Sequence, residues 1–410
     1  MRIAYFSPLN PIRSGISDYS EELLPSLAKY AQLDLFVDSY LPSSPVLRSR
    51  FAIFDVREFD SRWRSRRYDL CLYQMGNHAC HASAYRALQN HPGLTVLHDF
   101  YLHHLVVSIT AALGDEDAYV REMGYCHGRQ GIDSARQALA ANHCFAYDRF
   151  PANRRVVDAS FGIIVHSQYT RQLLAQSYPA RPVQVVPQIA SADVANESSR
   201  WTRSALGLDD HVIFGSFGQI TPTKRLAVAL RAFREVHARV PRSHYLIVGD
   251  AQPGMDIDEL IAKNDLAQAV IHTGYLPKSE LLACINLIDI GINLRWPILG
   301  ETSGSLLRLL AAGKPTIVTD AGPFAEFPDY FCPKVPVGTS EEALLAERMV
   351  TLARDVEARR AMGEAARAYV REHHSTEECA RRYVDFFEYV LNHRLGDLTA
   401  LGNAPRDSGS

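Results

Sequence analysis

Four small residues form the most informative motif of the sequence: Thr302, Ser303, Gly304 and Ser305. They stand directly before an apolar run at 306–312, which predicts a short helix that ends at Gly313, with Pro315 just beyond it. The N-terminus of a helix offers unpaired backbone N–H groups and a partial positive charge, and both suit a phosphate group. Glu301 stands just before the motif, where its carboxylate can hold sugar hydroxyls. The alternative is a capped surface helix, with Ser303 or Ser305 as the cap and a solvated Glu301.

Two cations stand between a predicted strand and a predicted helix in the second half of the chain. The strand covers 212–217, a loop covers 218–223, and Lys224 and Arg225 open the helix. Lysine binds phosphate as a point charge and arginine as a planar fork, so the pair suits a diphosphate. The alternative is a pair of solvated basic residues. Gly274 and Tyr275 follow the apolar pair at 270–271, in a turn whose aromatic ring can flank a nucleobase.

Polar residues also follow the predicted strands of the first half. Gly15 lies in the loop after the strand at 3–6, Asn77 after the strand at 69–73, and His98 and His103 after the strand at 94–97. His98, Asp99 and His103 have side chains of the types that bind metals, but their spacing matches no zinc signature. We therefore predict no metal, and expect these histidines to contact a polyol or a phosphate. The alternatives are a helix cap at Asp99, histidines satisfied in the core, and a plain turn at Gly15.

The elements that carry these residues alternate strand and helix twice along the chain. Strands at 3–6, 33–37, 69–73, 94–97, 161–165 and 183–186 belong to the first half, and strands at 212–217, 245–249, 270–271, 287–293 and 316–318 to the second. This pattern predicts two doubly wound α/β domains, whose ligands lie at the carboxyl ends of the strands, in a cleft between them. The predicted domains cover 1–190 and 209–375, with a linker near 188–208. A helix at 376–394 should pack back on the first domain, and 395–410 should be a disordered tail.

The totals restrict the class of protein. The chain has 410 residues, a net charge of −3 and seven cysteines without a CxxC pair. The charge offers no general attraction to nucleic acid, no apolar run approaches the roughly 20 residues of a membrane span, and the N-terminus lacks a signal peptide. We therefore expect a cytoplasmic protein with reduced thiols. The segment 62–67, Arg-Trp-Arg-Ser-Arg-Arg, either contacts anionic lipid at the inner face of the membrane or forms a solvated helix face.

The arrangement resembles the family-4 retaining glycosyltransferases of the GT-B type, over about residues 1–393. The resemblance rests on the glycine loop at 14–16, on Lys224 after Gly218, on Gly274-Tyr275, and on the stretch from Glu301 to Pro315. In that family the loop lysine and a neighbouring arginine neutralise the donor diphosphate, and small residues after the first glutamate of a Glu-x7-Glu motif bind the phosphate and the sugar. A histidine after the fourth N-terminal strand meets the donor sugar, and His98 matches that position.

The chain departs from the family pattern at four positions. Gln219 stands where the family has the arginine, Arg225 where it usually has glycine, and Arg308 where it has the second glutamate, which binds ribose. Glu301 lies one residue closer to Gly313 than in the family. We interpret this as a rearranged site, in which Arg225 and Arg308 help to bind the donor.

The resemblance implies a glycosyltransferase (EC 2.4, hexosyltransferase type) that moves a sugar from a nucleotide-diphosphate donor to a glycan, lipid-linked or small-molecule acceptor, as in polysaccharide biosynthesis. The expected catalytic residues are His98, Lys224 and Glu301, and the expected acceptor contacts are Asn77 and His103. No cofactor or metal is expected, because protein cations can stabilise the leaving group. Two alternatives remain open. One is a GT-B homologue that binds sugar or nucleotide without catalysis, and the other is a metal-dependent hydrolase built on the histidine-rich first half.

Overall fold

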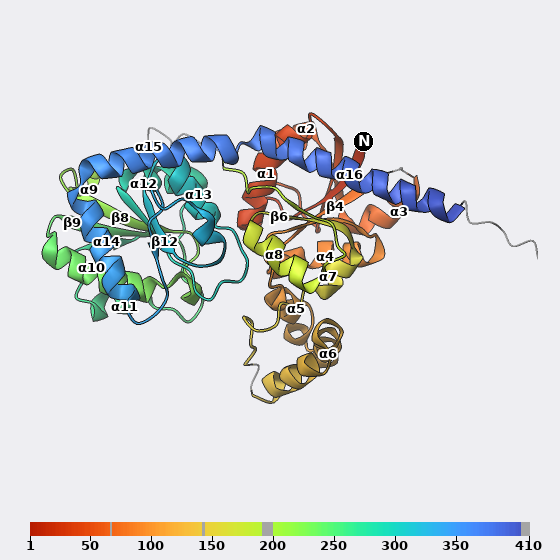
Figure 1. The fold of residues 1–410 in the computed structure, drawn as a ribbon, viewed down its shortest axis with the longest axis horizontal. Coiled ribbons are helices and arrows are strands. Elements are labelled where there is room, and N and C mark those ends of the chain that lie inside the picture. The colour runs from red at the N-terminus through yellow and green to blue at the C-terminus, as the bar shows by residue number, and fades with distance from the viewer. Residues whose placement is uncertain (66–67, 142–143, 191–199, 403–410) are drawn as a thin grey trace, which may run out of the picture. The chain divides into compact units, whose positions relative to one another are not determined.

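The computed structural model describes residues 1–65, 68–141, 144–190 and 200–402. The chain divides into two compact units (Figure 1). Unit 1 comprises Met1–Ile189, Leu299–Glu301 and the C-terminal segment from Thr376, and unit 2 comprises Ala190–Ile298 and Thr302–Ser375. The boundary between the units therefore falls directly before the predicted motif at 302–305, between Glu301 and Thr302.

Unit 1 is built on a seven-stranded parallel sheet with the strand order β3-β2-β1-β4-β5-β6-β7. Its strands are β1 (Arg2–Phe6), β2 (Gln32–Val37), β3 (Ala52–Asp55), β4 (Leu70–Met75), β5 (Gly93–Leu97), β6 (Ser160–Val165) and β7 (Val183–Val185). Tyr5 of β1 lies opposite Leu35 of β2 and Leu72 of β4. Ile3 and Tyr5 belong to the core on one face of this sheet, and the alternate residues Ala4 and Phe6 to the core on the other. Burial on both faces explains why these strands are nearly continuous apolar runs.

Helices cover both faces of this sheet (Figure 1). The helices of unit 1 are α1 (Gly15–Leu27), α2 (Pro45–Arg50), α3 (Phe59–Ser65), α4 (Ala82–Asn90), α5 (His103–Ile109), α6 (Glu116–Ala140), α7 (Arg154–Ala159), α8 (Gln168–Ser177) and α16 (Thr376–Gly402), of which α6 lies away from the sheet. Short 3-10 turns complete the unit: η1 (Val56–Glu58), η2 (Ala79–His81) and η3 (Ala111–Leu113). Ser14 caps α1, because its side chain accepts a hydrogen bond from Ile16 N.

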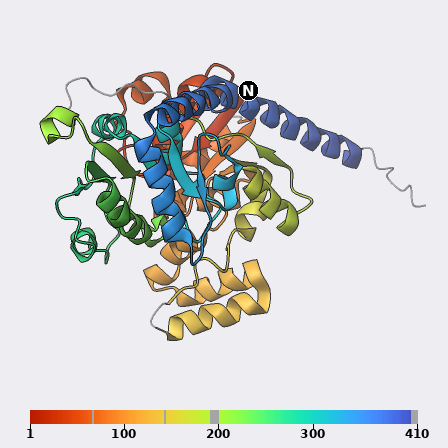
Figure 2. The same cartoon turned by 60° about the vertical axis from the view of Figure 1, so that its left-hand side comes forward.

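Two helical segments between β5 and β6 add a small core of their own. Helix α6 is broken at Gly128, which has φ 61°, and its two halves lie side by side (Figure 2). The halves are in close contact, since a Cβ atom on Gly131 would lie 2.1 Å from Met123 O. Tyr119 and Ala135 are buried in this small core.

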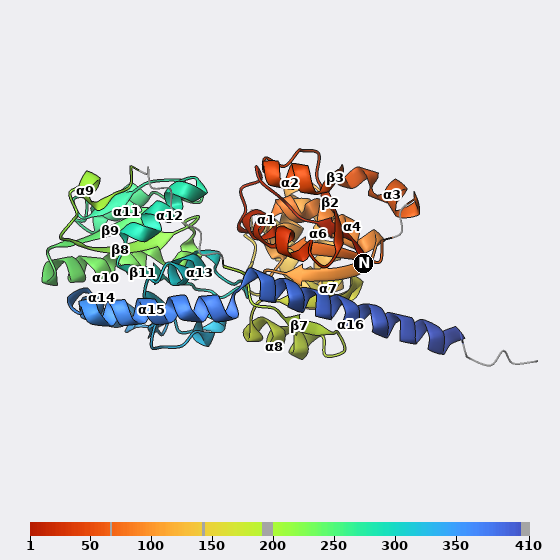
Figure 3. The ribbon, with the colours of Figure 1, turned by 90° about the horizontal axis from the view of Figure 1, so that it is seen from above.

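The C-terminal helix α16 packs on unit 1, alongside α1 (Figure 3). Tyr383 and Phe387 lie in the core with Leu23 and Leu24 of α1. The Tyr19 and Tyr383 hydroxyls are 2.6 Å apart. The helix differs from the prediction at its end: it continues to Gly402 instead of ending at 394, because 395–402 contain leucine and alanine, which favour helix. Positions 403–410 of the predicted tail lie outside the described residues.

Unit 2 has a six-stranded parallel sheet with the order β10-β9-β8-β11-β12-β13. Its strands are β8 (Val212–Phe217), β9 (Ser243–Val248), β10 (Val270–His272), β11 (Ile290–Asn293), β12 (Thr316–Thr319) and β13 (Lys334–Val335). Its helices are α9 (Arg203–Leu206), α10 (Leu226–Arg239), α11 (Ile257–Lys263), α12 (Lys278–Leu287), α13 (Gly304–Ala311), α14 (Glu341–Arg354) and α15 (Val356–His373), with the 3-10 turns η4 (Pro222–Lys224) and η5 (Gly322–Glu326). Part of the predicted linker, 191–199, lies outside the described residues.

Both sheets have a strand order that reverses direction at one point. Successive strands are added outward from β1 to β3 in unit 1 and from β8 to β10 in unit 2, and the next strand returns to the other side of β1 or β8. This is the doubly wound arrangement, in which ligands bind at the carboxyl ends of the strands that flank the reversal. The predicted fold class, two Rossmann-like α/β domains, is confirmed.

Candidate functional site

Lys224 lies at the carboxyl end of β8, where the strand order of unit 2 reverses. Its Nζ donates a hydrogen bond to Phe217 O at 2.6 Å. Gly218, with φ 83°, lets the ammonium lie against the backbone, since a Cβ atom there would be 2.9 Å from Nζ. Burial, together with the positive charge of Arg295, lowers the pKa of Lys224 well below its usual value. The fold therefore holds the Lys224 amine in a buried position that disfavours its charged form.

The structure corrects the prediction for Arg225. This residue has φ 54° and precedes the first residue of α10, and its guanidinium forms an ion pair with Glu341 at the start of α14. Arg225 Nε lies 2.7 Å from Glu341 Oε1, and the second guanidinium nitrogen bonds to Glu341 Oε2. Glu341 is only 2% exposed, so this carboxylate needs its partner inside the protein. Arg225 is thus committed to joining α10 and α14, and we do not assign it to a phosphate.

The four small residues at 302–305 form the N-terminus of α13. Ser303 is the N-cap, and its side chain accepts a hydrogen bond from Leu306 N at 3.2 Å. Asn293, the last residue of β11, donates to Ser303 Oγ at 3.0 Å and to Ser305 Oγ at 3.3 Å, which fixes the helix start against the sheet. The first N–H groups of a helix have no intrahelical acceptor, so the amides of Gly304 and Ser305 remain for a ligand. Arg308 lies half-buried on the second turn of the same helix.

Sequence reasoning missed two residues at this site, Asn293 and Arg295. Both line one small cavity with Lys224, Ser216 and Gly218. Asn293 is 5% exposed, and its Oδ1 is buried without a hydrogen-bond partner among the described residues. The available signal was their position, because Asn293 ends a buried strand and Arg295 lies two residues beyond it.

Glu301 belongs to unit 1, where the segment Leu299–Glu301 is held by main-chain contacts. Tyr101 N donates to Leu299 O at 3.2 Å, and Thr170 Oγ1 donates to Gly300 O at 2.9 Å. Glu301 Oε2 accepts a hydrogen bond from Leu299 N at 3.0 Å. Burial, and the nearby charge of Glu301, raise the pKa of Asp99 to about 7. The two carboxyl groups are therefore neighbours at the carboxyl end of β5.

His98 directly follows β5, and both of its ring nitrogens are hydrogen-bonded. Nε2 lies 2.7 Å from Gln74 Oε1, and Nδ1 lies 3.1 Å from His166 Nε2. His166 is held in turn by a contact of 2.9 Å between its Nδ1 and Val186 O. Burial, and the neighbouring His166 and His81, lower the pKa of His98 well below its usual value. A neutral ring with both nitrogens engaged is suited to positioning a ligand and not to transferring a proton.

The two predicted acceptor contacts have other roles. Asn77 Oδ1 accepts from Leu105 N at 3.1 Å and its Nδ2 lies 3.1 Å from His104 Nδ1, so the side chain anchors the start of α5. His103 has no exposed surface, and its Nε2 lies 2.7 Å from Tyr119 OH. The prediction for His103 was therefore wrong, because this histidine packs in the core. Among the described residues, no group of three or more His, Cys, Asp or Glu side chains is arranged to hold a metal ion.

Of the predicted glycines, Gly15 is the first residue of a helix and Gly274 lies just after β10. Gly15 begins α1, and a Cβ atom added there would meet no atom within 4 Å. Gly274 has φ 67° and accepts a hydrogen bond from Gly249 N at 2.9 Å, next to the end of β9. Tyr275 is 46% exposed, and its N donates to Asp250 Oδ1 at 2.9 Å. Its side chain is therefore about half-exposed near the carboxyl edge of the sheet of unit 2.

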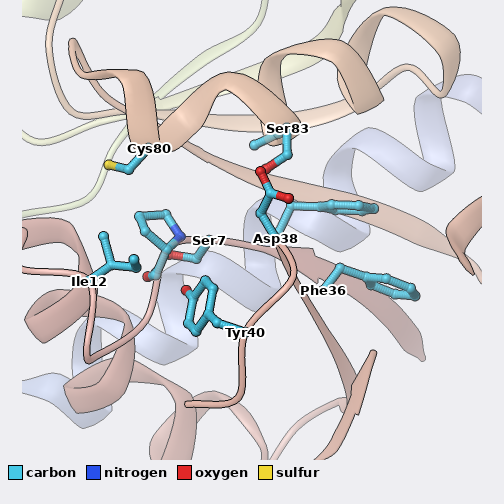
Figure 4. A pocket seen from close by; sticks show the side chains of 10 residues that line it. Ser7, Ile12, Phe36, Asp38, Tyr40, Cys80 and Ser83 are labelled. Atoms are coloured by element: carbon cyan, nitrogen blue, oxygen red, sulfur yellow. The ribbon is translucent and has the colours of Figure 1, made fainter. Parts of the chain in front are cut away.

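A second cavity, of about 130 Å³, lies in unit 1 at the carboxyl ends of β1 and β2 (Figure 4). Its apolar lining includes Phe6, Phe36 and Tyr40, and its polar lining includes Asp38 and Ser83. The sequence contained no motif for this cavity, because its residues come from four separate segments that the sheet brings together.

Comparisons with known proteins agree with this geometry. Residues 200–369 match the family model of glycosyl transferases group 1. A 2-deoxystreptamine glucosyltransferase from Streptomyces kanamyceticus is 24% identical over 192 residues, which is 45% of this chain and 49% of that protein. The chain thus matches about half the length of this curated relative. Within the described ranges, no helix is long and apolar enough to span a membrane.

Solved structures with the same architecture cover nearly the whole chain. HepE from Anabaena, in complex with UDP and glucose, is 16% identical, with a TM-score of 0.63 over 95% of this chain and 100% of that one. Sucrose-phosphate synthase from Thermosynechococcus elongatus is 14% identical, with a TM-score of 0.64 over 96% of this chain and 99% of that one. At these identities the likeness shows the fold alone, and that fold is GT-B.

Proposed function

We propose, from the group 1 glycosyl transferase family that residues 200–369 match and from the GT-B fold, that this protein is a retaining glycosyltransferase. It would move a sugar from a nucleotide-diphosphate donor to an acceptor hydroxyl, with the new bond formed on the face that the diphosphate leaves. The observation that carries this proposal is Lys224, an ammonium fixed at the carboxyl end of β8 and left with a depressed pKa. Preorganised positive charge of this kind stabilises a departing diphosphate.

The donor would lie across the carboxyl edge of the sheet of unit 2. Lys224 and the amides at the start of α13 would bind the diphosphate, and Tyr275 would flank the base. Arg308 would contribute a further positive charge from α13. The structures of HepE contain UDP, and this makes a uridine nucleotide the first donor to test.

We assign two residues of unit 1 to recognition of the donor sugar. Glu301 would hold sugar hydroxyls, and His98 would position the sugar without exchanging a proton, since both of its nitrogens are engaged. The proton of the acceptor would then pass to the departing diphosphate. No metal ion is needed in this scheme, because the protein supplies the positive charge.

The acceptor would bind in the cavity of unit 1 shown in Figure 4. Its volume, about 130 Å³, is slightly smaller than the roughly 150 Å³ of a cavity that holds benzene, so a six-membered ring with polar substituents would enter it only in part. Aromatic rings can pack on the C–H face of a sugar or a cyclitol, and Asp38 can accept hydrogen bonds from its polar groups. The curated relative is named for 2-deoxystreptamine, a small cyclic acceptor, and a ring of this size is our first choice.

Contact of the basic segment at 62–67 with a membrane stays a proposal, and Arg62 is already paired with Glu58.

The test is a thermal-shift screen of the full chain with UDP-, GDP- and ADP-sugars, followed by a transfer assay with cyclitol and monosaccharide acceptors. A ligand at 100 times its Kd adds about 2.7 kcal/mol of stability, which such a screen detects. We expect one donor series to stabilise the protein, and transfer to continue in excess EDTA. No stabilisation by any nucleoside diphosphate or its sugars would refute the proposed function, whereas loss of transfer in EDTA would refute only metal independence.

A further inference from the structure

Two positive side chains follow neighbouring strands at the point where the strand order of unit 2 reverses. Strands β8 and β11 pair in parallel, with Ile290 opposite Phe214. Lys224 follows β8 through the turn η4, and Arg295 follows β11 by two residues. Both line the same cavity. The carboxyl ends of the strands that flank such a reversal form the ligand crevice of doubly wound sheets.

Main-chain bonds hold this part of the structure in place. Arg295 N donates to Thr319 Oγ1 at 2.8 Å, and the guanidinium donates to Leu294 O at 3.1 Å. The next residue, Trp296, donates through its N to Thr223 O at 2.8 Å, which ties the segment to the turn that carries Lys224. Arg295 is only 9% exposed. The guanidinium is thus anchored beside the ammonium and is not a flexible surface group.

The neighbourhood of Arg295 differs from that of Arg225 in its electrostatics. Arg225 pairs with Glu341 and does not line this cavity, whereas Arg295 lines it together with Lys224, and its charge opposes protonation of Lys224. Two like charges held together in a partly buried site destabilise one another, and a ligand with two negative charges removes that repulsion.

We propose that Arg295, and not Arg225, is the second cation that binds the donor diphosphate. This assignment rests on the proposed function and names a residue of its site. Lys224, Arg295 and the first amides of α13 would surround the diphosphate on three sides. The cavity itself measures about 10 Å³, which is room for one water, so the phosphates lie at its mouth and reach the side chains from outside.

The test compares nucleoside diphosphate and monophosphate binding by calorimetry in the full chain. UDP and UMP are used first, and then the GDP/GMP and ADP/AMP pairs. In Arg295→Met, we expect the affinity for the diphosphate to fall roughly 10- to 100-fold, as for loss of a hydrogen-bonded charge, and the monophosphate affinity to change less than threefold. Arg295→Lys keeps the charge without the fork, and should recover only part of the diphosphate affinity.

Arg231→Met is the matched control, because Arg231 lies on α10 and pairs with Glu342 at the surface. It removes one positive charge from unit 2 and should leave both affinities unchanged. If a folded Arg295→Met binds the diphosphate as tightly as wild type, the assignment of Arg295 is overturned while the proposed function stands. If Arg295→Met does not fold, Arg295→Lys decides in the same way: a loss of less than threefold overturns the assignment. If the wild-type protein binds no nucleoside diphosphate, the proposed function itself fails.

Discussion

Replacing Lys224 by methionine is the most direct test of how this site works. An ammonium group has three N–H donors, and Phe217 O takes one of them. Two donors therefore remain for the diphosphate, each worth about 1.5–3 kcal/mol when the acceptor is charged. These two donors together are worth about 3–6 kcal/mol. The expected loss is smaller than this, because the lowered pKa of Lys224 means that its amine is less readily protonated in the free enzyme. We therefore expect a loss near the lower end, about 3–4 kcal/mol of transition-state stabilisation, which is roughly a 100- to 1,000-fold fall in turnover.

The assay is release of nucleoside diphosphate from the donor, measured with acceptor and, as slow hydrolysis, without it. Lys314→Met is the control, because the Lys314 ammonium is also partly buried but donates to Asn286 O at 2.9 Å and Ile288 O at 2.8 Å, at the end of α12. Burial lowers the pKa of Lys314 to about 8. This control should lower the stability of the protein by about 1–3 kcal/mol and leave turnover per folded molecule unchanged.

One result would refute the reasoning. If Lys224→Met folds and turns over the donor within about threefold of wild type, the fixed ammonium does not stabilise the leaving group, and the site lies elsewhere. A loss of turnover in Lys314→Met as large as in Lys224→Met would show that the assay reports unfolding and not catalysis.

Three further predictions concern stability. Because the folded pKa of Asp99 is about 7 and its usual value is 3.8, the stability from its protonated form is fully present below pH 4 and lost as the pH rises through 7. A shift of about 3 pKa units corresponds to about 4 kcal/mol, so the stability of Asp99→Asn in urea unfolding should rise by about this amount relative to wild type as the pH is raised from 4 to 8. Phe387→Ala should destabilise unit 1 by about 3–5 kcal/mol, because this ring of α16 is fully buried in the core of unit 1. A loss below about 1 kcal/mol would mean that α16 does not dock on unit 1. Gly300→Ala should lower the stability measured by thermal unfolding by about 1–3 kcal/mol, because φ at this position is 81° and the new Cβ would lie 2.5 Å from Phe100 Cβ. An unchanged stability would show that the segment before Glu301 can move away from Phe100.

The sequence allowed the central strands to be predicted, but not the short strands near the sheet edges. The central strands of both sheets are apolar runs because they are buried on both faces, as β1 and β8 show. Strands β3 and β13 were not predicted. Four residues in β3 and two in β13 carry too little pattern, and their pairing depends on neighbours far along the chain.

Local sequence context predicts the local structure where one continuous segment determines it. The start of α13 was recognised because cap, helix and glycine are contiguous. Arg225 was assigned from its place beside Lys224, but its partner Glu341 is 116 residues away and cannot be inferred from spacing. His103 was assigned from its place after a strand, but a helical segment between β5 and β6 buries it.

Arg295 shows how the fold class itself could have improved the prediction. A doubly wound sheet places its first and fourth strands next to each other, here β8 and β11. Charged residues just after those two strands must therefore meet, whatever lies between them in sequence. Applied to unit 2, this rule adds Arg295 to Lys224 and Arg225, and only the contact of Arg225 with Glu341 in the structure separates the two neighbours. The two cations lie at one partly buried crevice, and this determines the charge of the ligand that fits there. A doubly charged anion stabilises both cations, whereas a neutral ligand would leave their repulsion in place.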